Sequence, residues 1–208
     1  MDEKIWKTLP EVRGIRMTFG SHRDTDEHFS EPQKSAPYGI WHTETEFTWD
    51  DVRFTVKREW FGAPRNPHLF VYRQTVEPFA DCDFDAESRI DLPEEGSPWK
   101  VEKYLDREDN SCGLLLRHTE SGHLGVLCET SQITSFSIRV NETRDQILRT
   151  YHITAFEESP IRMEKYVSFH TDEEEDYEEL AFRECRDASR IRFDDLKGVG
   201  AWDYPRVI

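Results

Sequence analysis

The stretch over residues 147–202 constrains the fold most, because its hydrophobic period changes partway along. Apolar and polar residues alternate over 147–155 and again over 161–169, which is the pattern of two half-buried strands. Arg149 and Lys165 fall on the apolar faces of these strands. The short polar link over 157–160 predicts either a hairpin or a tight connection between them.

After the second strand, the apolar residues between Tyr177 and Ala188 recur at helical spacing. This spacing predicts an amphipathic helix with Glu and Arg on its other face. Residues 171–174 match a capping box, and acidic side chains are favourable at a helix N-terminus. We therefore expect the helix to begin there and the chain to continue as a linker.

The preceding chain reads as a series of short strands separated by turn signals. We expect strands over 12–19, 41–47, 52–60, 69–76, 82–90, 99–105, 112–119, 123–128 and 133–140. Many short strands and one helix predict a mainly β fold, an antiparallel β-sandwich of the supersandwich kind with one C-terminal linker helix. We divide the chain into a β-sandwich domain over 1–171 and a helix-and-linker segment over 172–208, which leads towards an absent catalytic domain.

Charge and composition exclude several partners. The formal net charge is -16, which argues against nucleic acid and against an anionic membrane surface. Aromatic residues make up 12% of the chain, more than disordered chains carry. The four cysteines form no Cys-x-x-Cys pair, and no apolar stretch resembles a signal peptide or a membrane span. We therefore expect free thiols and a cytoplasmic protein.

Two tryptophans are the candidates for carbohydrate binding. An aromatic face packs well against the apolar face of a pyranose ring, but only if the ring is exposed. Trp49 and Trp99 fall at loop or strand edges, whereas Trp41 and Trp60 share faces with core residues. Core packing is the alternative for Trp49 and Trp99 as well.

Acidic and histidine side chains offer weaker candidates. Glu44 and Glu46 lie two residues apart on one strand face and could act as a glycosidase pair, but a solvated strand face explains them in a chain with 43 acidic residues. His42 could join them as a metal ligand, and His118 and His123 could face each other across a hairpin. No further ligand follows at a recognisable spacing. We assign no catalytic residue, no metal site and no cofactor.

The order of these features resembles the N-terminal β-sandwich domain of family 65 glycoside hydrolases and phosphorylases. The resemblance is carried by residues 52–61, 67–78 and 88–91, and most closely by Met163-Glu164-Lys165-Tyr166-Val167-Ser168. Residues 193–202 resemble the linker into that family's helical catalytic barrel. Members act on maltose, trehalose, kojibiose and related α-glucosides.

The resemblance implies an accessory domain that supports a catalytic helical barrel, not a chain that is catalytic alone. The family's general acid and phosphate site lie in the barrel, so no catalytic residue is transferred to this sequence. An α-glucoside disaccharide and a homodimer are possible partners. The alternative is a free-standing carbohydrate-binding or protein-interaction β-sandwich; a small hydrolase that uses Glu44 and Glu46 is a third hypothesis.

Overall fold

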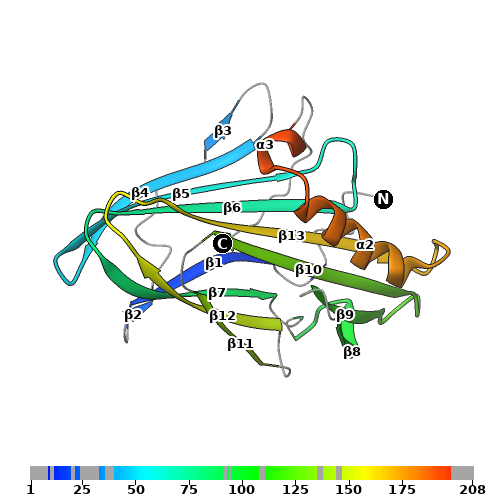
Figure 1. The fold of residues 1–208 in the computed structure, drawn as a ribbon. Coiled ribbons are helices and arrows are strands. Elements are labelled where there is room, and N and C mark those ends of the chain that lie inside the picture. Colours follow the sequence, from blue (N-terminus) through cyan, green and yellow to red (C-terminus); the bar gives the residue numbers. More distant parts are fainter. Residues whose placement is uncertain are drawn as a thin grey trace.

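The computed structural model describes residues 9, 12–19, 22–23, 33–35, 40–90, 93, 95–107, 111–134, 138–143 and 147–197. Within them, two antiparallel sheets face each other and a helix covers the outside of the larger one (Figure 1), so the predicted β-sandwich is confirmed. The strands are β1 (Val12–Phe19), β2 (His22–Arg23), β3 (Gln33–Ser35), β4 (Ile40–Trp49), β5 (Val52–Gly62), β6 (Leu69–Pro78), β7 (Cys82–Ile90), β8 (Trp99–Asp106), β9 (Ser111–His118), β10 (Leu124–Thr134), β11 (Ile138–Thr143), β12 (Ile147–Ala155) and β13 (Ile161–Thr171). The helices are α2 (Tyr177–Ser189) and α3 (Phe193–Leu196).

The five-stranded sheet has the order β11-β12-β7-β1-β2, and the eight-stranded sheet has the order β3-β4-β5-β6-β13-β10-β9-β8. β12 pairs with β7 and β11, whereas β13 pairs with β6 and β10. The 157–160 link is therefore a tight connection between the two sheets and not a hairpin. One predicted strand, over 133–140, is divided between the end of β10 and the start of β11.

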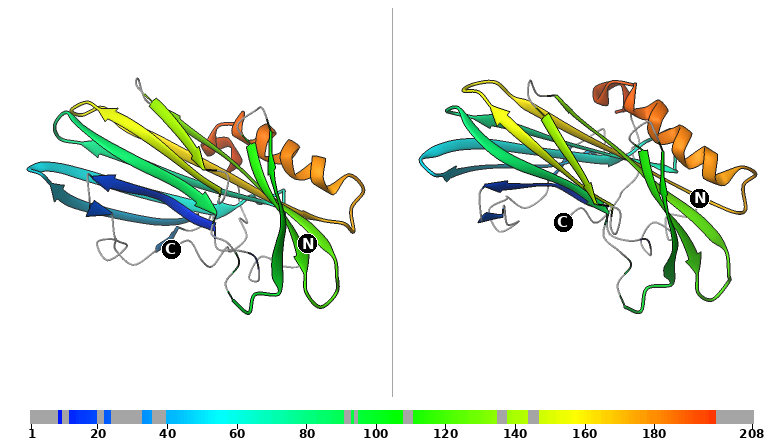
Figure 2. Two further views of the ribbon diagram at one scale, coloured as in Figure 1. Left: turned by 90° about the horizontal axis from the view of Figure 1, so that it is seen from below. Right: turned by 60° about the horizontal axis from the view of Figure 1, so that its bottom comes forward.

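Figure 2 shows the two sheets from two further directions. The main core lies between them, where the alternating strands place their apolar sides. β12 and β13 contribute Tyr151, Ile153, Ala155, Ile161, Met163, Val167 and Phe169 to this core. These are the apolar positions that the sequence alternation assigned to one face of each strand.

The helix buries the second face of the eight-stranded sheet. β13 alternates between buried and less buried residues near its start, and is then buried at every position from Lys165 to His170. α2 packs Ala181, Phe182 and Cys185 against Val126 and Cys128 of β10. Thus the eight-stranded sheet is covered on both faces near the end of β13, and only on its inner face near the start of β13.

Gly113 of β9 lets α2 come close to the sheet. A Cβ at this position would lie 3.2 Å from the Phe182 ring and 3.0 Å from the carbonyl oxygen of Leu127. Burying a Phe side chain stabilises a fold by about 1.5–3 kcal/mol. Gly113 leaves the space that the burial of Phe182 requires.

The helix starts later than the capping box predicted. α2 begins at Tyr177, after Asp176 with φ +57° and no capping hydrogen bond from its side chain. Thr171 is the last residue of β13, and two acidic residues after it contact residues of β10 and β13 instead of capping the helix. Asp172 accepts a hydrogen bond from the backbone N–H of Leu124, and Glu174 lies 2.7 Å from Nδ1 of His170. Among the described residues, no helix has the length and apolar character needed to cross a membrane.

The charged residues predicted on the apolar strand faces are buried in the core. Lys165 and Glu129 are both fully buried, and Lys165 Nζ lies 3.3 Å from Glu129 Oε2. The other Glu129 oxygen accepts hydrogen bonds from Ser88 and Ser131. Arg149 is 3% exposed. A buried ion pair thus joins the neighbouring strands β10 and β13 of the eight-stranded sheet, in the interior where its charges are screened very little.

Candidate functional site

The structure separates the two predicted carbohydrate-binding tryptophans. Trp49 ends β4 and is half-buried against the edge of the main core. Trp99 begins β8, is only 4% exposed and meets the rings of His118 and Phe169 edge to face. Trp99 does not present the exposed ring that its position in the sequence led us to expect. Sugar binding at Trp49 stays a prediction.

The acidic pair on β4 lies on a solvated strand. Glu44 and Glu46 are exposed, and His42 is half-buried. Glu44 pairs with Lys57 of β5 at 3.4 Å, and both side chains are more than half exposed. This arrangement is a surface ion pair, which contributes little to stability.

The two hairpin histidines turn to different partners. His118 Nδ1 accepts hydrogen bonds within its own turn, at 3.2 Å from the N–H of Ser121 and at 3.0 Å from its hydroxyl. His123 Nδ1 lies 2.9 Å from Asp172, beyond the end of β13. The predicted β9–β10 hairpin is therefore present, but its histidines do not face each other.

Three strand links gather at one end of the sandwich: β4–β5, β6–β7 and β12–β13 (Figure 1). Backbone hydrogen bonds connect them. Phe79 N–H donates to the carbonyl oxygen of Arg53 at 2.9 Å, and Glu158 N–H donates to that of Pro78 at 3.0 Å. Trp49 lies at this same end, beside the β4–β5 turn.

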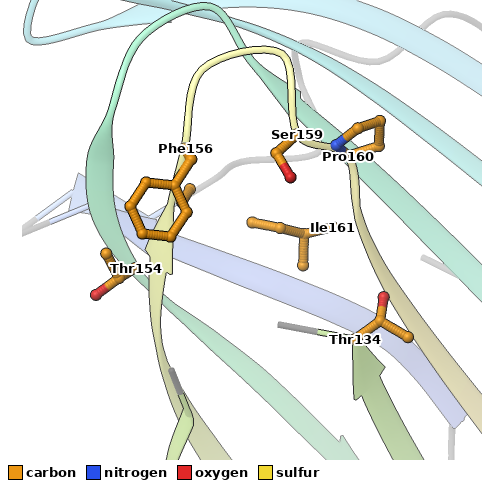
Figure 3. Close-up of a pocket in the computed structure, with 7 residues that line it drawn as sticks. Thr134, Thr154, Phe156, Ser159, Pro160 and Ile161 are labelled. Atoms are coloured by element: carbon orange, nitrogen blue, oxygen red, sulfur yellow. The ribbon is translucent and has the colours of Figure 1, made fainter. Parts of the chain in front are cut away.

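A pocket of about 330 Å³ opens beside the β12–β13 link (Figure 3). Its wall combines hydroxyl groups with an aromatic ring, and Phe156 is 44% exposed. The lining residues are Thr134, Thr154, Ala155, Phe156, Ser159, Pro160 and Ile161. An exposed ring beside several hydroxyl groups suits a small polyhydroxylated ligand, at the lower end of the usual volume of ligand pockets.

A second site fastens the C-terminal segment to the outer face of the sheet. Phe193 of α3 is 2% exposed and meets Phe61 edge to face with ring centroids 5.2 Å apart. The guanidinium carbon of Arg73 lies 4.0 Å from the centre of the Phe193 ring, and Lys197 Nζ lies 4.9 Å from it. Both are cation–π contacts, which gain strength where water is partly excluded.

Two carboxylates, Glu59 and Asp194, complete this second site. We call it the anchor: Phe193, Arg73 and Lys197 with these two carboxylates. Arg73 Nη2 lies 2.6 Å from Glu59, and Lys197 Nζ lies 3.1 Å from Glu59 and 2.7 Å from Asp194. Burial alone would raise the pKa of Glu59, but hydrogen bonds and charge from Arg73 and Lys197 outweigh it and hold that pKa below its usual value. Glu59 therefore stays ionised and paired with Arg73 and Lys197, where the C-terminal segment lies over β5 and β6.

Beside α2, four side chains from three parts of the chain meet. His68 precedes β6, His170 belongs to β13, Glu174 lies in the β13–α2 link and Glu184 lies on α2. The two imidazole rings stack with centroids 4.1 Å apart and 5° between their planes. His170 is 2% exposed, and its two nitrogens lie 2.7 Å from Glu174 and 2.9 Å from Glu184.

The carboxylates set the charge state of His170. Burial alone would lower its pKa, but the contacts with Glu184 and Glu174 outweigh it and raise the pKa above the usual value. Conversely, burial would raise the pKa of Glu184, but the close contact with His170 and its charge outweigh burial and lower that pKa. Sequence reasoning missed this cluster, because residues 68 and 184 lie far along the chain from His170 and Glu174, whose i,i+4 spacing alone is no metal motif.

The comparisons with known proteins agree with this architecture. The model of the glycosyl hydrolase family 65 N-terminal domain matches residues 38–199. Among solved structures, the fold is similar to that of a protein assigned as a kojibiose phosphorylase from the human microbiome. That similarity has a TM-score of 0.70 and 15% identity, and it covers 88% of this chain and 26% of that one.

A weaker similarity is found to heparinase III, with a TM-score of 0.42, 13% identity and coverage of 74% of this chain and 23% of that one. No curated protein matches the chain. The chain spans about a quarter of the length of the phosphorylase that it resembles. Because the family model covers most of the chain, the protein belongs to the glycosyl hydrolase family 65 N-terminal domain family.

Proposed function

We propose that this chain is the accessory domain of a family 65 enzyme that acts on α-glucosides by phosphorolysis or hydrolysis. In this proposal it supports a helical catalytic barrel and does not carry catalysis alone. The family membership and the similarity to a protein assigned as a kojibiose phosphorylase support the enzyme class. The proposal keeps the cytoplasmic location expected from the sequence, with homodimer formation as a further possibility.

The observation that carries the proposal is the anchor around Phe193. It holds α3 against β5 and β6 through ring contacts and ion pairs. A linker fastened in this way leaves the sandwich at a fixed place, so that a domain attached to it would be held in a defined orientation. A loose linker would give no such support.

A phosphorolysis assay tests the proposal. The purified chain is incubated with phosphate and kojibiose, maltose or trehalose, alone and mixed with a helical barrel encoded in the same or a neighbouring gene. We expect no glucose 1-phosphate from the chain alone, and turnover or a stable complex once the barrel is added. Turnover by the chain alone would contradict the accessory role. A Glu44→Gln/Glu46→Gln double variant would then show whether β4 carries the reaction.

The pocket beside the β12–β13 link supports a second candidate, a carbohydrate-binding β-sandwich. It places the exposed Phe156 ring and the Ser159 hydroxyl around about 330 Å³, while the Thr134 and Thr154 hydroxyls of its wall are hydrogen-bonded to Arg162 and Asp83. Trp49, at the same end of the sandwich, is the aromatic residue that the sequence proposed for this role.

Calorimetric titration with the same disaccharides separates the two candidates. If the pocket binds sugar, Phe156→Ala removes the heat of binding, because the stacking surface is lost. Ile191→Ala is the matched control, since Ile191 is similarly exposed at 45% but lies after α2. A Trp49→Phe variant tests the contribution of the indole while keeping most of its packing. Equal binding in the wild type and Phe156→Ala would exclude the pocket.

A further inference from the structure

The cluster at the sheet–helix junction has the composition and geometry of a metal site. One ligand atom from each of His68, His170 and Glu174 lies within 4.8 Å of the other two. Among the residues that the structure describes, this is the one group of three or more His, Cys, Asp or Glu side chains whose ligand atoms lie this close together. We propose that these three residues bind a divalent transition metal ion of the zinc class.

His68 is held with one nitrogen facing the cluster. Its Nδ1 lies 3.0 Å from the carbonyl oxygen of Phe169, which can only accept, so Nδ1 carries the hydrogen. Its Nε2 lies 3.7 Å from a Glu174 oxygen. In the neutral ring, a lone pair therefore faces a carboxylate. Two acceptors turned towards each other are favourable when a cation lies between them, either a proton or a metal ion.

His170 is oriented in a similar way by a second acceptor. Its Nδ1 lies 2.7 Å from Glu174, on the side of the proposed ion. Its Nε2 lies 2.9 Å from Glu184, but this contact is poorly aligned and leaves both buried atoms without a well-directed hydrogen bond. A carboxylate behind the remote nitrogen of a histidine is the usual outer partner of a metal-bound imidazole. Glu184 is thus a positioning residue for His170.

The ligand types and the available reach suit zinc. Two histidines and one glutamate are a common protein ligand set for zinc, with a fourth position left to water. In a tetrahedral site, two Zn–N bonds of about 2.0–2.1 Å place the nitrogens roughly 3.4 Å apart, and the ligand atoms here lie within 4.8 Å of one another. The two rings are stacked nearly parallel, so binding requires one imidazole to turn out of the stack until both lone pairs point at one ion. Glu174 is 34% exposed, which provides access from solvent, while His170 is buried.

The ion would connect three elements at the start of the C-terminal segment: the residue before β6, strand β13 and the link to α2. Binding would displace the proton from Nδ1 of His170 and neutralise charge on Glu174. This inference is independent of the proposed enzyme class, because it rests on residues within the sandwich.

Zinc titration of the full chain, first stripped with EDTA, tests the inference. Competition with a chromophoric zinc indicator should show one equivalent bound, and Co²⁺ should give the absorption of a low-symmetry, four-coordinate site. We expect His68→Gln and Glu174→Gln each to weaken binding by at least tenfold, and zinc to raise the unfolding midpoint of the wild type but not of His68→Gln.

His152→Gln is the matched control, because His152 also contacts a carboxylate, Asp85, but on the five-stranded sheet. It should bind zinc as the wild type does, and circular dichroism confirms that each variant is folded. The proposal is overturned if the wild type binds no saturating equivalent of zinc, or if folded His68→Gln and Glu174→Gln bind zinc as tightly as the wild type.

Discussion

At the residue scale, two lysine–glutamate pairs of similar length lie in opposite surroundings. Lys165 and Glu129 are 3.3 Å apart and fully buried. Lys57 and Glu44 are 3.4 Å apart and more than half exposed. Exposed pairs contribute little because water and salt screen them, whereas breaking a buried pair leaves a charge without compensation. The distance between the charges therefore does not show which of the two pairs contributes more to stability.

We expect Glu129→Gln to reduce the free energy of unfolding by about 3–5 kcal/mol, because Lys165 would stay buried opposite a neutral group. Glu44→Gln is the matched control and should change stability by less than about 0.5 kcal/mol. Urea unfolding of the two variants and the wild type provides the measurement. Similar losses of unfolding free energy in both variants would show that the buried pair contributes no more to stability than the exposed pair.

The same residue predicts a pH dependence. Burial alone would raise the pKa of Glu129, but the charges of Lys165 and Arg149 and hydrogen bonds from Ser88 and Ser131 lower it below the usual 4.5. A carboxyl whose pKa is lower in the folded state stabilises the fold above its unfolded pKa, and this stabilisation is lost as pH falls through the folded pKa. Wild-type stability should therefore fall below about pH 4.5 more steeply than that of Glu129→Gln. Parallel pH profiles of the two proteins would exclude this role.

At the element scale, alternation located most strands because one face of each is buried in the core. It located β4 to β7 closely, and the helical spacing found the buried face of α2. It did not locate the helix start, because Asp172 bonds to Leu124 of β10 and Glu174 contacts His170 of β13, and both contacts compete with a local cap. Alternation likewise does not say which sheet a strand joins, so β12 and β13 could not be assigned to separate sheets from their sequences.

The β4–β5 turn offers a stabilising substitution. Its central residues, Asp50 and Asp51, have φ of +47° and +62°. Two positive φ values in a two-residue hairpin loop indicate a type I′ turn, in which Asp-Gly is strongly favoured. We expect Asp51→Gly to raise the urea midpoint by an amount equivalent to about 0.5–1 kcal/mol, because glycine adopts positive φ without strain. Asp51→Ala removes the same charge without that freedom and should give no gain. An equal gain from alanine would assign the effect to charge.

At the scale of the whole molecule, function-related clusters form where segments far apart in the sequence meet. The anchor joins Glu59 and Arg73 to Phe193 and Lys197, and the histidine cluster joins His68 to residues more than 100 positions later. The sequence predicted a sandwich with a terminal helix, and it identified the stretch around Phe193 through family resemblance and its aromatic residues, without its partners on β5 and β6. Neither cluster is complete within one local segment, because each depends on strands that are far apart in the sequence.

The anchor leads to a prediction for the entire C-terminal segment. Phe193 fills a site between Phe61 and the guanidinium of Arg73. Its removal would leave a cavity and expose the ion pairs to water. We expect Phe193→Ala to lower the free energy of unfolding by about 3–5 kcal/mol, and to speed hydrogen exchange in α2 and α3 more than in the strands between the sheets.

Ile191→Ala is the control for this test, because Ile191 lies two residues away but is 45% exposed. It should leave both stability and exchange nearly unchanged. Faster exchange confined to α2 and α3 in Phe193→Ala would mean that this ring fastens the segment to an otherwise stable sandwich. Uniformly faster exchange would instead mean that the segment and the sandwich unfold as one unit, so that a partner pulling on the linker would strain the whole domain.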